Sequence, residues 1–329
     1  MKLSELCCFL LVGTTAVCAS AYKKEPNFLN ARRNGGLARI VLRVVDDESS
    51  PVADTKVRVF MGMNFRERGY WLEGTTDTNG VFMIDGKTTG NEIEIDLSKD
   101  GYYDSKKKLC FIKMGAEHNV EDGKWQPYGE KLTIRLRPIK KPLKLRSVQV
   151  QNYKFTEETC EWIGYDLEMN DFVKPHGKGM TADFEVYLDW DKVYSFDCRQ
   201  IGFMIRFVEP WSGYYEVPVD DESELSTPYN AEPCFQFLQK ASFYDRYGGE
   251  RIRNTFDKSK CWVIRSRCKI DEQGRLISAN YSVARFLGIS GSCNLSAGFC
   301  FLGAFNPTPN DTNLEDDALY QQYNRFRGR

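Results

Sequence analysis

Four acidic residues lie along one alternating segment of this 329-residue chain. Large apolar side chains alternate with polar ones from residue 183 to 190, and the acidic members are Asp183, Glu185, Asp189 and, one residue beyond the segment, Asp191. Same-face neighbours in an extended strand lie about 6.6 Å apart. Two such carboxylates could act as the acid and base of a glycosidase. The same pattern is typical of an amphipathic strand with a solvated face, which is the interpretation we favour.

A second acidic run has the alternating oxygen ligands of some calcium loops. It reads Asp311-x-Asn313-x-Glu315. The sixth position of an EF-hand loop requires glycine, and Asp316 stands there instead. Asp311, Asn313 and Glu315 are therefore weak metal candidates, with a polar loop as the alternative, and we expect no cofactor.

Nucleophilic and metal-dependent catalysis have little support in the sequence. His118 and His176 are the only histidines, too few for the usual zinc sites. A Cys/His dyad would need one of them beside a free thiolate. Phosphate-binding, dinucleotide-binding, nucleophile-elbow and zinc-protease motifs do not occur. We therefore predict no catalytic residues.

Aromatic side chains near loops suggest binding instead. Trp211, Tyr214 and Tyr215 are closely spaced, and aromatic rings commonly line ligand sites. Core packing is the alternative for such rings. We expect these three residues to be candidates for stacking on a sugar.

The N-terminus predicts export. Lys2 precedes the apolar segment 6–17, and Ala19-Ser20-Ala21 offers a cleavage site before Tyr22. Lipidation at Cys18 is left open. No later segment is apolar for long enough to predict a transmembrane helix. We expect a secreted, periplasmic or cell-envelope protein after cleavage near Ala21.

The cysteines permit disulfide bonds in an oxidising compartment. Eleven are present, and eight follow the leader. Cys261 and Cys268 cannot pair on one strand, because seven residues span about 23 Å. Buried free thiols are the alternative. The candidate disulfide cysteines are Cys160, Cys198, Cys234, Cys293 and Cys300.

Strand patterns dominate the first third of the chain. Ile40, Leu42 and Val44 alternate with their neighbours, and Asn79-Gly80 favours a type I′ hairpin turn. Seven short strands with turn signals between them predict a β-sandwich over 39–138, after a tether at 22–38. The net charge of -1 favours neither nucleic acid nor an anionic membrane as a partner.

The same segment resembles a known family. The residues that carry the resemblance are Pro51-Val52-Ala53, Thr76-Asp77-Thr78-Asn79-Gly80-x-Phe82 and Gly101-Tyr102. In these residues the segment is similar to the carboxypeptidase regulatory-like domain, a transthyretin-like sandwich of seven strands. That family's module is non-catalytic. The resemblance therefore implies a spacer or adhesion role and no active site.

The remainder predicts a second, larger sandwich. Prolines at 138 and 142 mark a stiff linker over 139–145, followed by alternating strands within 146–305 and a tail at 306–329. One helix is predicted at 233–247, between Pro233 and Gly248-Gly249. We therefore expect an exported, all-β, non-enzymatic binding or structural protein with a glycan or protein partner. A glycoside-active enzyme or carbohydrate-binding accessory protein is the alternative.

Overall fold

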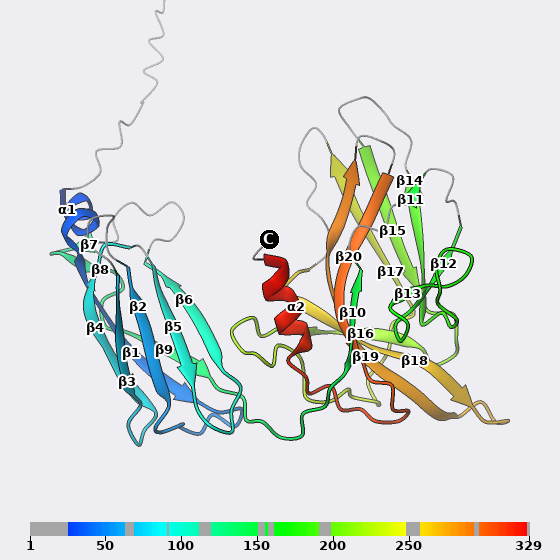
Figure 1. The fold of residues 1–329 in the computed structure, drawn as a ribbon, viewed down its shortest axis with the longest axis horizontal. Coiled ribbons are helices and arrows are strands. Elements are labelled where there is room, and N and C mark those ends of the chain that lie inside the picture. The colour runs from blue at the N-terminus through cyan, green and yellow to red at the C-terminus, as the bar shows by residue number, and fades with distance from the viewer. Residues whose placement is uncertain are drawn as a thin grey trace, which may run out of the picture.

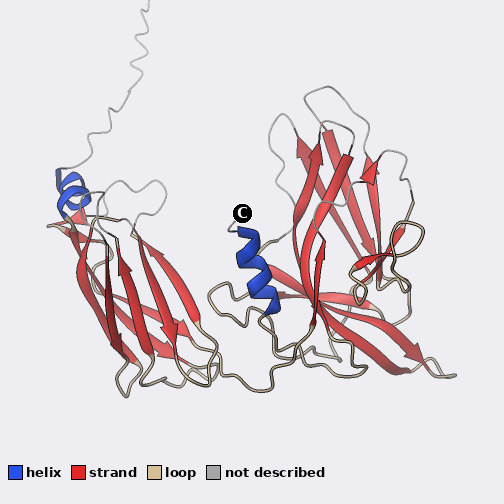
Figure 2. Ribbon diagram, viewed as in Figure 1, coloured by secondary structure: helices blue, strands red, loops and turns tan. Residues whose placement is uncertain are grey.

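The computed structural model describes residues 26–62, 69–90, 92–111, 120–150, 155–156, 161–190, 199–247, 257–292 and 296–327. Strands dominate these residues, which confirms the all-β class. The helices among them are α1 (Pro26–Asn34) and α2 (Ala318–Arg327). Two β-sandwiches follow each other along the chain, with α1 at one end of the first and α2 against the second (Figures 1 and 2).

The first sandwich contains two sheets. In one, β1 (Gly36–Val45) lies between β4 (Val81–Thr88) on one side and β9 (Glu130–Arg135) and β8 (Lys124–Trp125) on the other, and β7 (Val120–Glu121) pairs with β8. The other has the order β3 (Tyr70–Thr75), β2 (Lys56–Met61), β5 (Glu92–Ser98), β6 (Ser105–Cys110). Seven of these strands have six or more residues, in agreement with the prediction.

Period-two alternation determines which side chains of this sandwich are buried in its core. Ile40, Leu42 and Val44 have no exposed surface, whereas Arg39 and Arg43 on the same strand face solvent. Each apolar side chain removed from water contributes about 1.5–3 kcal/mol to folding. The inward residues of β1 therefore fix which side of the strand faces the second sheet.

The Asn79-Gly80 turn differs from the predicted hairpin. Of its two central residues only Gly80 has a positive φ, at 69°, so a type I′ turn is excluded. The flanking strands also belong to different sheets, since β3 pairs with β2 and β4 pairs with β1. Asp77 holds the turn, because its Oδ1 accepts hydrogen bonds from the amides of Asn79 and Val81. The turn therefore carries the chain from one sheet to the other.

The second sandwich packs a six-stranded sheet on a five-stranded one. The larger sheet comprises β10 (Arg146–Val150), β20 (Ser296–Phe305), β19 (Leu276–Ser292), β18 (Lys260–Ile270) and β16 (Gly213–Pro218), with β11 (Phe155–Thr156) beside β20. The smaller has the order β13 (Asp171–Phe172), β12 (Ile163–Asp166), β14 (Phe184–Trp190), β15 (Arg199–Arg206), β17 (Lys240–Tyr247). Aromatic residues from both sheets, including Phe184, Phe203, Trp262 and Phe301, form the core between them.

The helix predicted at 233–247 is wrong. Residues 240–247 form β17, which pairs with β15 over its whole length. Phe235 and Phe237 pack on Tyr215, with ring centroids 4.5 and 5.2 Å away. Pairing and aromatic packing therefore override the helix signals of Pro233 and the glycine pair.

Both helices lie where the sequence predicts irregular chain. α1 falls in the expected tether, and α2 falls in the expected tail. Leu319 of α2 is buried against the outer face of the six-stranded sheet, in a cluster with Val263 and Leu302. The tail is therefore part of the second domain's fold.

Residues 220–229 of the second sandwich form one of its contacts with the first. Arg137 Nη1 donates to the carbonyl oxygens of Leu225 and Thr227 at 2.7 and 2.6 Å. The Arg137 guanidinium also lies over the Tyr229 ring, 4.4 Å from its centroid. Arg135 pairs with Asp220 at 2.9 Å. Because Arg137 is largely buried, this contact is a packed junction and more than a tether.

Candidate functional site

A bulge in β18 organises the most polar region of the second sandwich. β18 pairs with β19 without a break up to Ser266, and the register shifts before Lys269. Arg267 within the bulge has a φ of 54°. A non-glycine residue in this region stores about 1–3 kcal/mol of strain. Bulges re-aim side chains that strict alternation would place elsewhere, and here Arg267 turns toward β12 and the start of β14.

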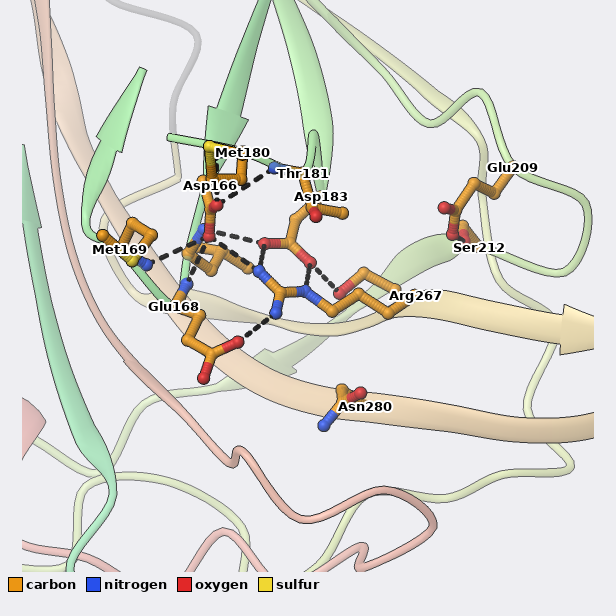
Figure 3. A network of polar contacts seen from close by, with 12 residues as sticks. Asp166, Glu168, Met169, Met180, Thr181, Asp183, Glu209, Ser212, Arg267 and Asn280 are labelled. Atoms are coloured by element: carbon orange, nitrogen blue, oxygen red, sulfur yellow. Dashed lines mark hydrogen bonds and ion pairs between the residues drawn. The ribbon is translucent and has the colours of Figure 1, made fainter. Parts of the chain in front are cut away.

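Arg267 gathers three carboxylates (Figure 3). Its Nε and Nη2 donate to the two oxygens of Asp183 at 3.0 and 3.1 Å. Nη2 also donates to Asp166 at 2.7 Å, and Nη1 pairs with Glu168. Asp183 and Asp166 are almost fully buried. Arg267 therefore compensates the two buried carboxylates and shares the partly exposed Glu168 with Arg146.

The remaining oxygen sites of these carboxylates are also occupied. Asp183 accepts hydrogen bonds from the Ser266 hydroxyl at 2.6 Å and from the Leu167 amide at 2.7 Å. Asp166 accepts from the amides of Glu168, Met169, Met180 and Thr181. The network therefore ties two loop segments of the five-stranded sheet to β18.

The two buried aspartates differ in their acidity. Burial raises the pKa of Asp183, and the hydrogen bonds from Arg267 and Ser266 only partly oppose it. Burial would also raise the pKa of Asp166, but the amides of Met169, Met180 and Thr181, together with Arg267, lower it overall. Asp166 is therefore held as the anion, as expected for a structural acceptor.

The acidic side chains proposed as a glycosidase pair do not meet. Asp183 is buried against Arg267, whereas Glu185 pairs with Arg206 at 2.6 Å. The structure describes only the backbone of Asp189, and Asp191 lies outside the described residues. Each of the two described carboxylates is thus engaged by its own arginine.

On the other side of the bulge, Cys268 contacts the loop before β16. The Cys268 amide donates to Glu209 Oε2 at 3.0 Å. Ser212 Oγ donates to the same carboxylate oxygen at 3.3 Å and also contacts Cys268 Sγ at 3.4 Å. Glu209 therefore fixes the four-residue turn 209–212, which contains Trp211.

Trp211 is the exposed end of this arrangement. Its φ is 68°, an unusual value for a bulky residue. Its carbonyl oxygen accepts from Arg265 Nε at 2.7 Å, and its indole N–H donates to the Gly274 carbonyl at 3.0 Å. The residue nevertheless remains 49% exposed. The residue is thus strained, held at several points and open to solvent.

The other two aromatic candidates belong to the core. Tyr214 stacks on Trp262, with centroids 3.7 Å apart, and Tyr215 packs between Phe235 and Phe237. Both tyrosines are more than nine-tenths buried. Burial raises the pKa of Tyr214 to about 12. Neither ring offers a face to a sugar, so Trp211 is the only one of the three that remains a candidate for stacking.

Two of the weak metal candidates form hydrogen bonds to the linker, and the third binds one of these two. Glu315 accepts hydrogen bonds from the amides of Lys140 and Lys141 at 2.7 and 2.6 Å, and Asn313 donates to the Lys141 carbonyl at 2.7 Å. Asp311 accepts from the Asn313 amide. Across the residues that the structure describes, no group of three His, Cys, Asp or Glu side chains could hold a metal ion. This segment therefore acts as a clamp on the linker.

The described cysteines are thiols. Cys234 and Cys300, expected in disulfides, are both free, as are Cys110, Cys261 and Cys268. Cys234 is exposed on its loop, and Cys300 is half-buried in β20. The expectation of disulfides at these two positions is therefore corrected. Cys160, Cys198 and Cys293 lie outside the described residues, as do His118 and the predicted leader.

Sequence reasoning missed Arg267, Glu209 and the bulge that connects them. Simple alternation places Cys268 and Ile270 on the same face as Trp262, but Ile270 is 44% exposed because the register has shifted. The available signal is an arginine between a serine and a cysteine, late in a strand whose apolar residues are concentrated in its first half. It does not by itself identify the partners.

The fold and this site define a two-domain β-sandwich protein. No family model and no curated protein matches the chain. Its resemblance to the carboxypeptidase regulatory-like domain therefore stays a prediction. No helix in the described part of the chain is long and apolar enough to cross a membrane.

Several solved structures share a limited similarity with the chain. 3-Chlorocatechol 1,2-dioxygenase from Rhodococcus opacus 1CP matches 32% of this chain at 16% identity, with a TM-score of 0.25. Hydroxyquinol 1,2-dioxygenase from Pseudomonas putida DLL-E4 matches 32% at 13% identity (TM-score 0.24), and catechol 1,2-dioxygenase from Acinetobacter radioresistens matches 34% at 13% identity (TM-score 0.27). The matches span 62%, 58% and 55% of those chains. At such scores no argument about ligand or chemistry follows.

Proposed function

We propose that the chain is an exported, non-enzymatic binding protein of the cell envelope or extracellular space, and that it binds a glycan at Trp211. The observation that carries the proposal is the conformation of Trp211. A left-handed backbone at a bulky residue costs about 1–3 kcal/mol, and strain of this kind clusters at ligand sites. A surface tryptophan without a function would have no reason to keep a backbone conformation that costs this much free energy.

The ring of Trp211 is arranged for stacking. Its indole N–H is tied to Gly274, so the ring is held by one edge. In the part of the chain that the structure describes, no other ring and no cation stacks on it. A flat, pre-positioned aromatic face loses little conformational entropy on binding, and this supports recognition of the apolar face of a sugar.

Trp71 in the first sandwich provides the matched control. It is 42% exposed, close to the exposure of Trp211, but it packs on Phe60 at 5.2 Å and lies under the Arg58 guanidinium at 4.4 Å. Its ring is therefore already occupied. Replacing Trp71, like replacing Trp211, removes one exposed tryptophan, but it leaves the proposed site unchanged.

The test is a glycan array probed with the mature chain from Tyr22, with Trp211→Ala and with Trp71→Ala. We expect retention on a defined set of glycans that Trp211→Ala weakens by about tenfold or more, equivalent to about 1.4 kcal/mol. Trp71→Ala should bind like the wild type. Thermal unfolding of each variant separates lost binding from lost folding.

Two results would contradict the proposal. Retention of no glycan, or equal retention by the wild type and Trp211→Ala, excludes Trp211 as a sugar platform. Hydrolysis of a retained glycan that Glu185→Gln abolishes would make the protein an enzyme. Retention of no glycan would instead favour a protein partner or a spacer role.

A further inference from the structure

The outer face of the first sandwich carries a hollow of about 450 Å³. It lies on the sheet formed by β4, β1 and β9, on the side turned away from the core. Its apolar lining comes from Val41, Val81 and Pro51, and its polar lining includes Arg43, Lys131 and Thr133. Its volume falls within the range of small-molecule sites, about 300–1,000 Å³.

Strand register brings the two cations to the same place. Val41 is opposite Lys131, and Arg43 is opposite Thr133, in the parallel pairing of β1 with β9. Arg43 and Lys131 are therefore diagonal neighbours on one face, about 7–8 Å apart at the backbone. On the other side of β1, Arg43 is opposite Val81 of β4. The two long side chains can converge above an apolar floor.

Neither cation is neutralised within the described residues. Arg39, four residues before Arg43 on the same face, pairs with Asp85, and Arg135 pairs with Asp220 and Asp47. In contrast, no described residue forms a hydrogen bond or ion pair with the side chain of Arg43 or Lys131. The chain as a whole carries a net charge of -1, so this positive spot is local.

We infer that this hollow binds a small organic anion. Its carboxylate would lie between Arg43 and Lys131, and its apolar body would cover Val41, Val81 and Pro51. Two like charges this close repel each other, and an anion between them removes the repulsion while forming charge-assisted hydrogen bonds. The site lies in the first sandwich and does not depend on Trp211.

The test uses benzoate as the probe and benzamide as its uncharged analogue. Valine-methyl NMR of the full mature chain reports directly on Val41 and Val81 during titration. We expect benzoate to shift both methyl groups and to bind more weakly as salt concentration rises. The double variant Arg43→Gln/Lys131→Gln should weaken this binding by about fivefold, given the usual strength of exposed charge pairs.

Lys56→Gln is the matched control, because Lys56 is an exposed lysine on β2 in the opposite sheet. It should leave benzoate binding unchanged. Equal binding of benzamide and benzoate overturns the inference, as does benzoate binding that the double variant leaves intact. Methyl shifts confined to valines elsewhere, or no shifts at all, also overturn it. Unfolding curves of the double variant verify that its fold is retained.

Discussion

At the scale of single residues, Arg267 forms ion pairs with three carboxylates, those of Asp166, Glu168 and Asp183. Its guanidinium is the cation that compensates both Asp183 and Asp166, and both aspartates are almost completely buried. Removing one partner of such a network leaves uncompensated buried charge, which typically costs about 3–5 kcal/mol. We expect Arg267→Met to lower the free energy of unfolding by about this amount, as measured by urea denaturation.

Arg146→Gln is the control for that measurement. Arg146 also pairs with Glu168, at 2.8 Å, but its side chain is 51% exposed. Exposed pairs are worth about 0–1 kcal/mol, so this variant should remain close to the wild type. Equal losses in the two variants would show that the network is not the source of the stability.

Asp166 predicts a dependence of stability on pH. Its pKa is lowered in the folded protein, below the value of about 3.9 expected in the unfolded chain. Its ionised form therefore stabilises the fold above that value, and the contribution is lost as the pH falls through the folded pKa. The stability difference between wild type and Asp166→Asn should be larger at pH 7 than near pH 3. A difference that does not change with pH would contradict this assignment.

Thiol reactivity distinguishes the described cysteines. Burial raises the pKa of the Cys261 thiol to about 12 and that of Cys300 to about 11, whereas Cys110 and Cys234 are exposed. The thiolate is the reactive form. Brief alkylation of the native protein at pH 8, followed by peptide mass mapping, should label Cys110 and Cys234 and leave Cys261 unlabelled. Recovery of Cys234 or Cys300 in a disulfide-linked peptide would contradict the structure.

The sequence predicted buried residues well wherever a strand is regular. Ile40, Leu42 and Val44 follow the pattern because each shift of one residue reverses the face. The partners of Arg267 and the backbone conformation of Trp211 could not be predicted in this way. Both residues have left-handed backbones imposed by surrounding contacts, and those contacts come from segments distant in sequence.

At the scale of elements, the Asp77–Gly80 turn joins the two sheets of the first sandwich. A Cβ on Gly80 would lie 2.4 Å from the Val44 carbonyl oxygen, and its φ is positive. Gly80→Ala therefore combines backbone strain of about 1–2 kcal/mol with a steric overlap of about 1–3 kcal/mol. We expect it to destabilise the protein by at least about 2 kcal/mol in thermal or urea unfolding.

Gly101 separates these two contributions. Its φ of 83° is also positive, but a Cβ there would meet no atom within 4 Å. Gly101→Ala should therefore show the backbone strain alone and cost less than Gly80→Ala. If the two variants were equally stable, close packing of the turn against β1 would not matter.

Turn signals at these glycines could be read from the sequence, but their connectivity could not. Asn-Gly identifies a tight turn, whereas the partner of each flanking strand is decided by packing across the sandwich. The predicted helix at 233–247 failed for the same kind of reason. Local propensity is a weak prior, and eight backbone pairs with β15 outweigh it.

At the scale of the whole molecule, the C-terminal segment adds a second contact between the two sandwiches. Glu315 binds the amides of Lys140 and Lys141, and its Oε1 also accepts from the Tyr103 hydroxyl of the first sandwich at 3.2 Å. Burial, and then the charge of Glu315, raises the pKa of that hydroxyl, so Tyr103 remains a donor. One carboxylate therefore connects both domains and the linker.

This arrangement predicts that the linker is protected from proteolysis. The glutamine in Glu315→Gln has a single acceptor oxygen, so one of the two linker amides loses its partner. A hydrogen bond to a charged group contributes about 1.5–3 kcal/mol. Local opening of the linker should therefore increase by about tenfold or more, and trypsin cleavage at the Lys140–Lys141 bond should accelerate equally when opening limits access.

Asp317→Asn removes the same charge two residues away. The Asp317 side chain contacts Gln321 of α2, and no hydrogen bond joins it to a described linker residue. Its cleavage rate should match that of the wild type. Equal rates in all three proteins would mean that the linker is protected by packing alone. Faster cleavage only in Glu315→Gln would show that the tail, through the carboxylate of Glu315, holds the linker in place against the second sandwich.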